Sequence, residues 1–167
     1  MPLRVIRGMM GSEPERARAL IELEDRIIER AVEQREGERM SAAQARRRYE
    51  IPRNVLDRLA ELGVLTPTSR GYDADDVKII EAVSRFRAGG YDEQLGFTVF
   101  DTLRYRDALE PLVAEEVSIL LDRLADEVEV ERALEIIAAG AEPLRDLIGA
   151  MHSKLLLAEL RRQRDRR

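Results

Sequence analysis

Apolar residues at helical spacing run through most of the sequence, and this periodicity restricts the chain to a mainly all-α fold. In residues 14–36, apolar side chains recur at spacings of three, four and seven, which gives a helix one apolar stripe. Charged residues make up 37% of the chain and aromatic residues only 4%. This composition favours helices with charged outer faces over a β-sandwich.

Capping signals divide the middle of the chain into shorter helices. Ser41 and Gln44 have the form of a capping box, which starts a helix that runs to about Arg48. Pro52 suits the first turn of the next helix, and Gly63 is a natural end for it. A turn-rich segment follows, which we expect to be two very short strands or an irregular loop.

Glycines and prolines set the expected boundaries in the second half. Asp73 is the expected N-cap of a helix that ends at Gly89 and Gly90. We expect a shorter helix near residues 97–109 and another that opens at Pro111. Two further helices are expected at residues 130–140 and 142–167.

Charge is distributed unevenly along the chain, which carries a net charge of −5. Residues 41–72 contain six basic and three acidic side chains, whereas residues 107–135 contain ten acidic and two basic ones. We therefore expect one basic module and one acidic module, with the boundary in composition near Glu110.

The basic segment has the pattern of a helix-turn-helix, in which the second helix is charged on its outer side. Arginine can bind guanine through two hydrogen bonds, and asparagine can pair with adenine, so this helix carries residue types suited to base readout. Arginines just before it suit phosphate contacts. A solvated face of a surface helix is the alternative explanation of the same charges.

Beyond this pattern, the order of features resembles a known family. Leu62, Gly63, Val64 and Leu65 precede Pro67, a compact loop ends at Tyr72, and an acid-started helix ends at a glycine that precedes an aromatic residue. Over residues 41–105 this order resembles the winged helix-turn-helix of the MerR family of bacterial transcription regulators. The resemblance implies a DNA-binding domain at 41–105 with a minimal β-wing after the recognition helix. An N-terminal helical extension at 1–40 would precede this domain, and a helical dimerisation or effector region at 106–167 would follow it.

This resemblance implies a transcription regulator that binds double-stranded DNA in a sequence-specific manner. A single helix-turn-helix grips one half-site, so we expect a homodimer held by the C-terminal helices. RNA polymerase is a further candidate partner. The expected DNA-binding residues are Arg46, Arg47, Arg48, Arg53, Asn54, Arg58 and Arg70.

Two departures from the family pattern keep other functions open. Asp57 lies where the family usually has an arginine, and Glu50 lies where the turn usually favours glycine. Asp57 is also one helical turn from Arg53, a spacing at which the two can pair. The alternatives are a helical protein-interaction module with a degenerate DNA-binding surface, and a small-molecule-sensing regulator with a pocket among the C-terminal helices.

Catalytic and metal-binding patterns are weak in this sequence. The chain has no cysteine, and His152 is its only histidine, so thiolate sites and histidine clusters are excluded. No glycine-rich phosphate loop or nucleophile elbow occurs. We expect no enzymatic activity and no cofactor. The apolar runs are too short to span a bilayer and no signal peptide is recognisable, which favours a cytoplasmic protein with no membrane partner.

Overall fold

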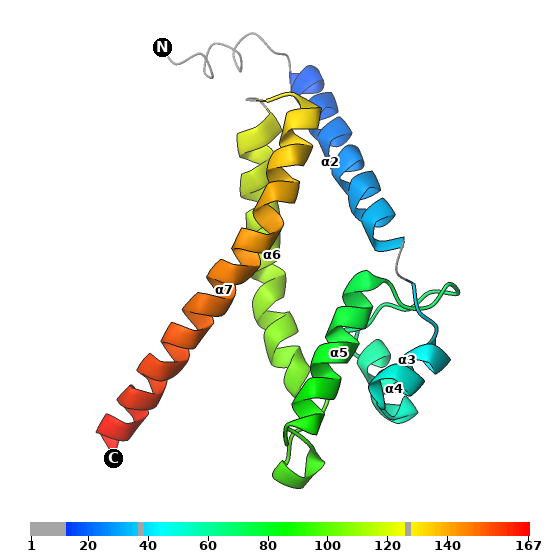
Figure 1. The fold of residues 1–167 in the computed structure, drawn as a ribbon. Coiled ribbons are helices and arrows are strands. Elements are labelled where there is room, and N and C mark those ends of the chain that lie inside the picture. The colour runs from blue at the N-terminus through cyan, green and yellow to red at the C-terminus, as the bar shows by residue number, and fades with distance from the viewer. Residues whose placement is uncertain (1–12, 37–38, 126–127) are drawn as a thin grey trace. The chain divides into compact units, whose positions relative to one another are not determined.

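A computed structural model of the chain describes residues 13–36, 39–125 and 128–167, and it confirms a mainly helical fold (Figure 1). The elements in chain order are α2 (Glu13–Glu36), α3 (Ala42–Tyr49), α4 (Arg53–Glu61), α5 (Ala74–Ala88), the short 3-10 helix η1 (Glu93–Leu95), α6 (Asp101–Ala125) and α7 (Val130–Arg166). None of these helices combines the length and apolar character needed to cross a membrane.

The chain divides into two compact units. One comprises residues 27–120, and the other comprises the segment up to Arg26 together with residues 121–167. Both boundaries fall inside helices, α2 and α6, whereas the sequence analysis placed boundaries near residues 41 and 106. Helices α3, α4 and α5 therefore belong to one unit, and α7 belongs to the other.

In the first unit, α3, α4 and α5 enclose a small apolar core (Figure 1). Leu56 and Leu59 lie on the inner face of α4 with exposed fractions of 1% and 0%, and Ile80 of α5 is equally buried. The Ser84 hydroxyl donates to the carbonyl of Tyr49 at 2.7 Å, which ties α5 to the end of α3. The core holds Ala45, Ile51, Val55, Leu56, Leu59, Leu65, Tyr72 and Ile80.

Both expected N-terminal caps of this unit are present. The Ser41 hydroxyl accepts from the backbone N–H of Gln44, and the side-chain Oε1 of Gln44 accepts from the backbone N–H of Ser41 at 2.9 Å. Asp73 and Asp76 make the same reciprocal pair at the start of α5. These caps satisfy backbone donors that the first helical turn leaves without partners, so they fix where α3 and α5 begin.

Two expected helix boundaries were wrong. Pro111 lies inside α6, so there is no separate helix at residues 97–109, and Pro143 lies inside α7, which joins the two expected C-terminal helices. A proline inside a helix removes one backbone hydrogen bond and clashes with the preceding turn. Both prolines are exposed, so water can solvate the carbonyls that lose their donors.

The loop at residues 66–72, here called the 66–72 loop, forms no β-strand, and the described parts of the chain contain none. The expected β-wing is reduced to two isolated bridges, Thr68 with Gly71 and Met40 with Tyr72. Gly71 has a φ of +94°, and a Cβ there would lie 2.4 Å from the Met40 carbonyl oxygen. The close approach of the two segments therefore requires glycine.

The second unit contains the long helix α7. Leu23 of α2 and Ala133 and Leu134 of α7 are buried in it, and Arg26 donates to Glu131 at 2.5 Å. Beyond Ile137, every side chain of α7 is exposed in the described structure except Glu159, which is partly buried. The C-terminal part of this helix thus presents its apolar residues to solvent.

Glu50 ends α3 in the left-handed conformation, with a φ of 52°. It is the only residue other than glycine with a positive φ in the described part of the chain. Glycine adopts this conformation freely, whereas a residue with a Cβ is strained in it.

Replacing Glu50 by glycine should raise the free energy of unfolding by about 0.5–1 kcal/mol, since relief of backbone strain exceeds the added entropy of the unfolded chain. Glu50→Ala is the matched control, because it removes the charge but keeps the Cβ, and it should stay near wild type. Urea unfolding of the three proteins measures both effects. Equal stability of Glu50→Gly and wild type would contradict the strain assigned to this position.

Candidate nucleic-acid interface

Three expected phosphate-binding arginines occupy the last turns of α3. Arg47 and Arg48 are exposed, whereas Arg46 is half-buried. The Arg48 guanidinium lies 5.4 Å from the centroid of the Tyr49 ring. None of the three has a carboxylate partner among the described residues, so their positive charge is available to a ligand. A shallow groove of about 400 Å³ is bordered by Arg39, Met40, Gln44, Arg47 and Arg48.

The outer face of α4 carries the expected base-reading residues. Arg53 and Asn54 are exposed in its first turn. Arg53 Nε lies 3.6 Å from an Asp57 carboxylate oxygen. The two residues, one helical turn apart in the sequence, therefore form an ion pair. Both side chains are largely exposed, at 76% and 61%, and an exposed pair of this kind contributes about 0.3–0.5 kcal/mol at most.

Arg58 lies one turn further along α4 and is held from two sides. Its guanidinium donates to Glu61 at 3.1 Å and lies 5.5 Å from the centroid of the Phe100 ring. A carboxylate and an aromatic face together neutralise and orient the side chain. Arg58 is therefore less available to DNA than Asn54, which makes no side-chain hydrogen bond in the described structure.

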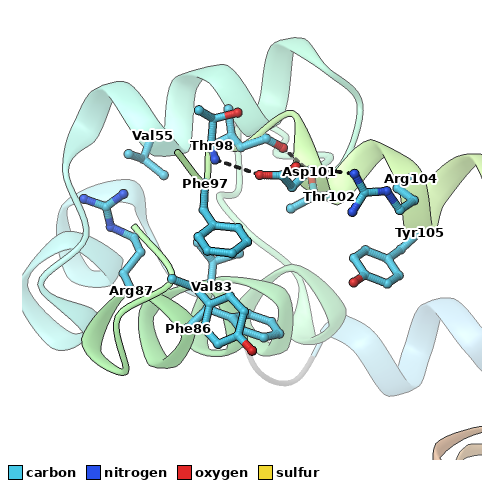
Figure 2. Close-up of a pocket in the computed structure, with 12 residues that line it drawn as sticks. Val55, Val83, Phe86, Arg87, Phe97, Thr98, Asp101, Thr102, Arg104 and Tyr105 are labelled. Atoms are coloured by element: carbon cyan, nitrogen blue, oxygen red, sulfur yellow. Dashed lines mark hydrogen bonds and ion pairs between the residues drawn. The ribbon is translucent and has the colours of Figure 1, made fainter. Parts of the chain in front are cut away.

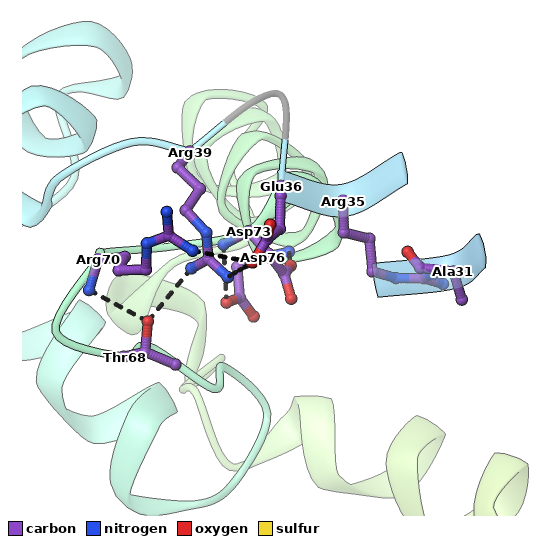
Figure 3. A network of polar contacts seen from close by, with 8 residues as sticks. All are labelled: Ala31, Arg35, Glu36, Arg39, Thr68, Arg70, Asp73 and Asp76. Atoms are coloured by element: carbon purple, nitrogen blue, oxygen red, sulfur yellow. Dashed lines mark hydrogen bonds and ion pairs between the residues drawn. The ribbon is translucent and has the colours of Figure 1, made fainter. Parts of the chain in front are cut away.

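Arg70, the expected phosphate contact of the 66–72 loop, is paired with the end of α2 (Figure 3). Its guanidinium donates to Glu36 Oε1 at 2.9 Å, and its backbone N–H donates to the Thr68 hydroxyl at 3.1 Å. Arg39 reaches the same two partners, with a hydrogen bond of 3.2 Å to Thr68 and an ion pair of 3.9 Å to Glu36. Glu36 at the end of α2 thus pairs with both Arg39 and Arg70.

A buried carboxylate fixes the 66–72 loop to α5. Asp76 is 3% exposed and accepts from Thr66 N–H at 3.1 Å as well as from Asp73 N–H at 3.3 Å. Burial raises the pKa of Asp76 above its ordinary value, although the two backbone hydrogen bonds oppose that shift. The position of the 66–72 loop therefore depends on a carboxyl group whose ionisation is unfavourable.

Tyr72 closes the same loop and is also buried, at 4% exposed. Burial raises the pKa of its hydroxyl, the charges of Asp57 and Asp76 raise it further, and the charge of Arg46 lowers it. Side chains from α3, α4 and α5 therefore act electrostatically on one buried phenol.

The structure groups the expected residues only in part. Arg46, Arg47 and Arg48 stand on one helix without carboxylate partners in the described chain, whereas Arg53, Arg58 and Arg70 each have one. Sequence reasoning missed Glu36 and Phe100 as partners of these arginines. Glu36 is 34 residues from Arg70, and no local pattern links positions so far apart.

No group of three or more His, Cys, Asp or Glu side chains that could hold a metal ion occurs among the described residues. Comparison with family models, curated proteins and solved structures finds no match to this chain. The function of this surface must therefore be judged from its own geometry and charge.

The raised pKa of Asp76 predicts a pH-dependent stability. Because the folded pKa lies above the unfolded value of about 3.9, Asp76 favours the folded state below that pH and loses this contribution as pH rises through the folded pKa. Wild type should therefore lose stability relative to Asp76→Asn as pH rises from 4 to 7. The measured quantity is the difference between their free energies of unfolding. Urea unfolding of both proteins at each pH measures it, and a difference that grows with pH would contradict the burial assigned to this carboxyl.

Proposed function

We propose that this protein is a MerR-like winged helix-turn-helix regulator that binds double-stranded DNA in a sequence-specific manner as a homodimer. One observation carries the proposal. Arg46, Arg47 and Arg48 follow one another on α3 just before α4, and no carboxylate in the described chain neutralises them. In a protein with a net charge of −5, such a concentration of free positive charge suits a polyanionic partner.

The form of α4 supports a role in the major groove. It is nine residues long, and Val55, Leu56 and Leu59 are buried, so its polar residues all point away from the core. A helix with this division can enter a groove about 12 Å wide while its apolar side stays in the domain. Arg53 and Asn54 lie in its first turn, where recognition helices contact base edges.

Two local features support the family assignment over residues 41–105. Glu50 has the left-handed conformation that glycine favours at this position, and the 66–72 loop stands directly after α4 as a wing would. The loop also carries Arg70 on its outer side.

A second candidate function is supported by the ion pairs. Arg53, Arg58 and Arg70 are each bound to a carboxylate, which leaves less positive charge for DNA than the sequence suggested. A protein-interaction module with the same fold would retain such pairs, because it has no need of free arginines. DNA binding and its salt dependence distinguish the two functions.

The exposed part of α7 supports the homodimer. Four of its apolar side chains are between 38% and 68% exposed: Leu144, Ile148, Met151 and Leu155. An isolated helix with so much exposed apolar surface would be only marginally stable in water. Together with Ala141 and Ala158 these four residues alternate at spacings of three and four, the repeat of a coiled-coil seam. A second copy of α7 would cover this seam.

The charges of α7 favour an antiparallel pair. Residues 129–146 carry five acidic and two basic side chains, whereas residues 154–167 carry six basic and two acidic ones. An antiparallel arrangement places the acidic half of one helix against the basic half of the other, while a parallel one brings like charges together. The two halves are balanced about a midpoint near Gly149.

Salt dependence tests the proposed DNA binding. Binding to a duplex should weaken steeply as salt rises, because neutralised phosphates release counterions, and Arg47→Ala should reduce the log–log slope by about one unit. Arg85→Ala removes one exposed arginine from α5 and should leave the slope unchanged. Fluorescence anisotropy at several salt concentrations measures both. Absence of binding at low salt to specific and random duplexes alike would favour the interaction module.

Removing Asp57 should have opposite effects on two properties, the preference for one DNA sequence and the affinity for any duplex. If Asp57 holds Arg53 in position to read a base, Arg53→Ala should cost about 1–3 kcal/mol on the preferred site and remove the preference. Asp57→Ala should loosen the preference but strengthen binding to a scrambled duplex, since a negative charge near phosphate disappears.

Affinities of the two variants for the preferred and scrambled duplexes at one salt concentration decide this point. Glu81→Ala is the control, because it removes an exposed acid of α5 that forms no ion pair with the candidate arginines in the described structure. An unchanged preference in Arg53→Ala would mean that α4 does not read bases through this arginine.

Disulfide crosslinking tests the dimer and its orientation, since the chain has no native cysteine. In an antiparallel pair centred near Gly149, two Met151→Cys residues should lie close enough to join, whereas two Ala158→Cys residues would be about 27 Å apart. Crosslinking of both variants would indicate a parallel pair. A mass of 19.1 kDa by light scattering at micromolar protein would contradict the dimer itself.

A further inference from the structure

A small apolar cavity lies in the unit of residues 27–120, away from the arginines of α3. Its volume is about 130 Å³, and it is lined by α5, the first turn of α4, the segment at 97–99 and the first turns of α6 (Figure 2). Most of its wall is aromatic or aliphatic. Figure 2 shows the rings of Phe86 and Phe97 on one side and that of Tyr105 on another.

The aromatic side of the cavity is an ordered cluster. Tyr91 meets Phe86 edge to face with ring centroids 5.3 Å apart, and its centroid lies 4.8 Å from that of Phe97. Yet the rings of Phe86, Tyr91 and Tyr105 are each about half exposed, at 54% to 55%. The Phe86, Tyr91 and Phe97 rings are therefore held by one another, and with Tyr105 they offer partly exposed edges and faces to a further ring.

The polar groups at the rim are largely satisfied by one another. Arg87 donates to Glu93 at 2.5 Å, and Arg104 lies 3.7 Å from Asp101. The Asp101 carboxylate also accepts from Thr98 N–H at 2.8 Å. Since each guanidinium has a carboxylate, the rim has little net charge to offer a charged ligand.

The hydroxyl of Thr98 keeps hydrogen-bonding capacity. The Thr98 hydroxyl accepts from Phe100 N–H at 3.3 Å, and it donates to no partner in the described structure. By contrast, the Thr102 hydroxyl already donates to the Val99 carbonyl at 2.5 Å. The hydroxyls of Tyr91 and Tyr105, which also line the cavity, have no hydrogen-bond partner among the described residues either. The cavity thus combines a largely apolar wall with a few available hydroxyl groups, a pattern typical of sites that orient a small ligand.

We propose that this cavity is a binding site for a neutral single-ring aromatic molecule that carries one hydroxyl or carbonyl group. Its size suits one ring, because an engineered apolar cavity of about 150 Å³ binds benzene. The ring would stack against the aromatic side, and its oxygen would accept from Thr98. Val55 of α4 also lines the cavity, so the ligand would touch the inner side of the helix proposed to read DNA.

Binding of 4-fluorophenol, followed by ¹⁹F NMR, tests the site without any need for DNA binding. Titration of the full chain should give a saturable shift, and cyclohexanol at the same concentration should not displace the probe. Tyr105→Ala removes an exposed ring of the wall and should weaken binding about 2- to 10-fold. Val83→Phe fills the cavity and should abolish binding.

Phe100→Ala is the matched control, because Phe100 is 52% exposed in the same unit but does not line the cavity. Unchanged probe binding in this variant supports the site. Equal loss of binding in Phe100→Ala and Tyr105→Ala would overturn it, as would the lack of saturation in wild type. If no probe binds and Tyr105→Ala lowers the mass of the assembly, a second copy covers the cavity and the proposal is wrong.

Discussion

Ion pairing within the chain decides how much positive charge this protein can offer to a partner. Arg53, Arg58 and Arg70 each have a carboxylate within reach, at 3.6, 3.1 and 2.9 Å. These are exposed pairs, so each contributes little to stability and can exchange its carboxylate for another anion. A DNA phosphate that displaced Glu36 from Arg70 would break a weak contact to make a similar one. The net gain would come from the release of counterions.

The arginines of α3 differ from those of α4 and the loop in this respect. Arg46, Arg47 and Arg48 have no carboxylate to exchange in the described structure, so they would contribute most to attraction at a distance. The paired arginines would act once the duplex is in place. Asp57 would repel a phosphate directly, which makes it either a device that positions Arg53 or a sign of weakened DNA binding.

The scaffold beneath these charges depends on a few buried groups. The apolar face of α4 fixes its orientation, and the Asp76 carboxyl holds the 66–72 loop against the start of α5. Tyr72, at the end of the loop, belongs to the same buried core as the apolar face of α4. The position of Arg70 therefore depends on buried groups of the core. Loss of the Asp76 carboxyl would shift the 66–72 loop and with it Arg70.

Local signals in the sequence were enough to predict most of this scaffold. Caps at Ser41 and Asp73 and the apolar face of α4 each depend on residues a few positions apart, and the structure contains them all. Prolines misled the prediction, since Pro111 and Pro143 lie where exposed helices tolerate them. Long-range pairs were not predictable. Neither the Glu36–Arg70 bond nor the aromatic cavity has a signature in neighbouring residues.

Selection from a pool of random DNA duplexes tests the central claim most directly. Purified full-length protein would be equilibrated with the pool at moderate salt, and bound duplexes would be recovered, amplified and sequenced over several rounds. A homodimeric helix-turn-helix regulator should enrich a two-fold symmetric motif whose half-sites are about one helical turn apart. Recovery of sequences without any shared motif, at the level of a protein-free control, would contradict sequence-specific DNA binding by this chain.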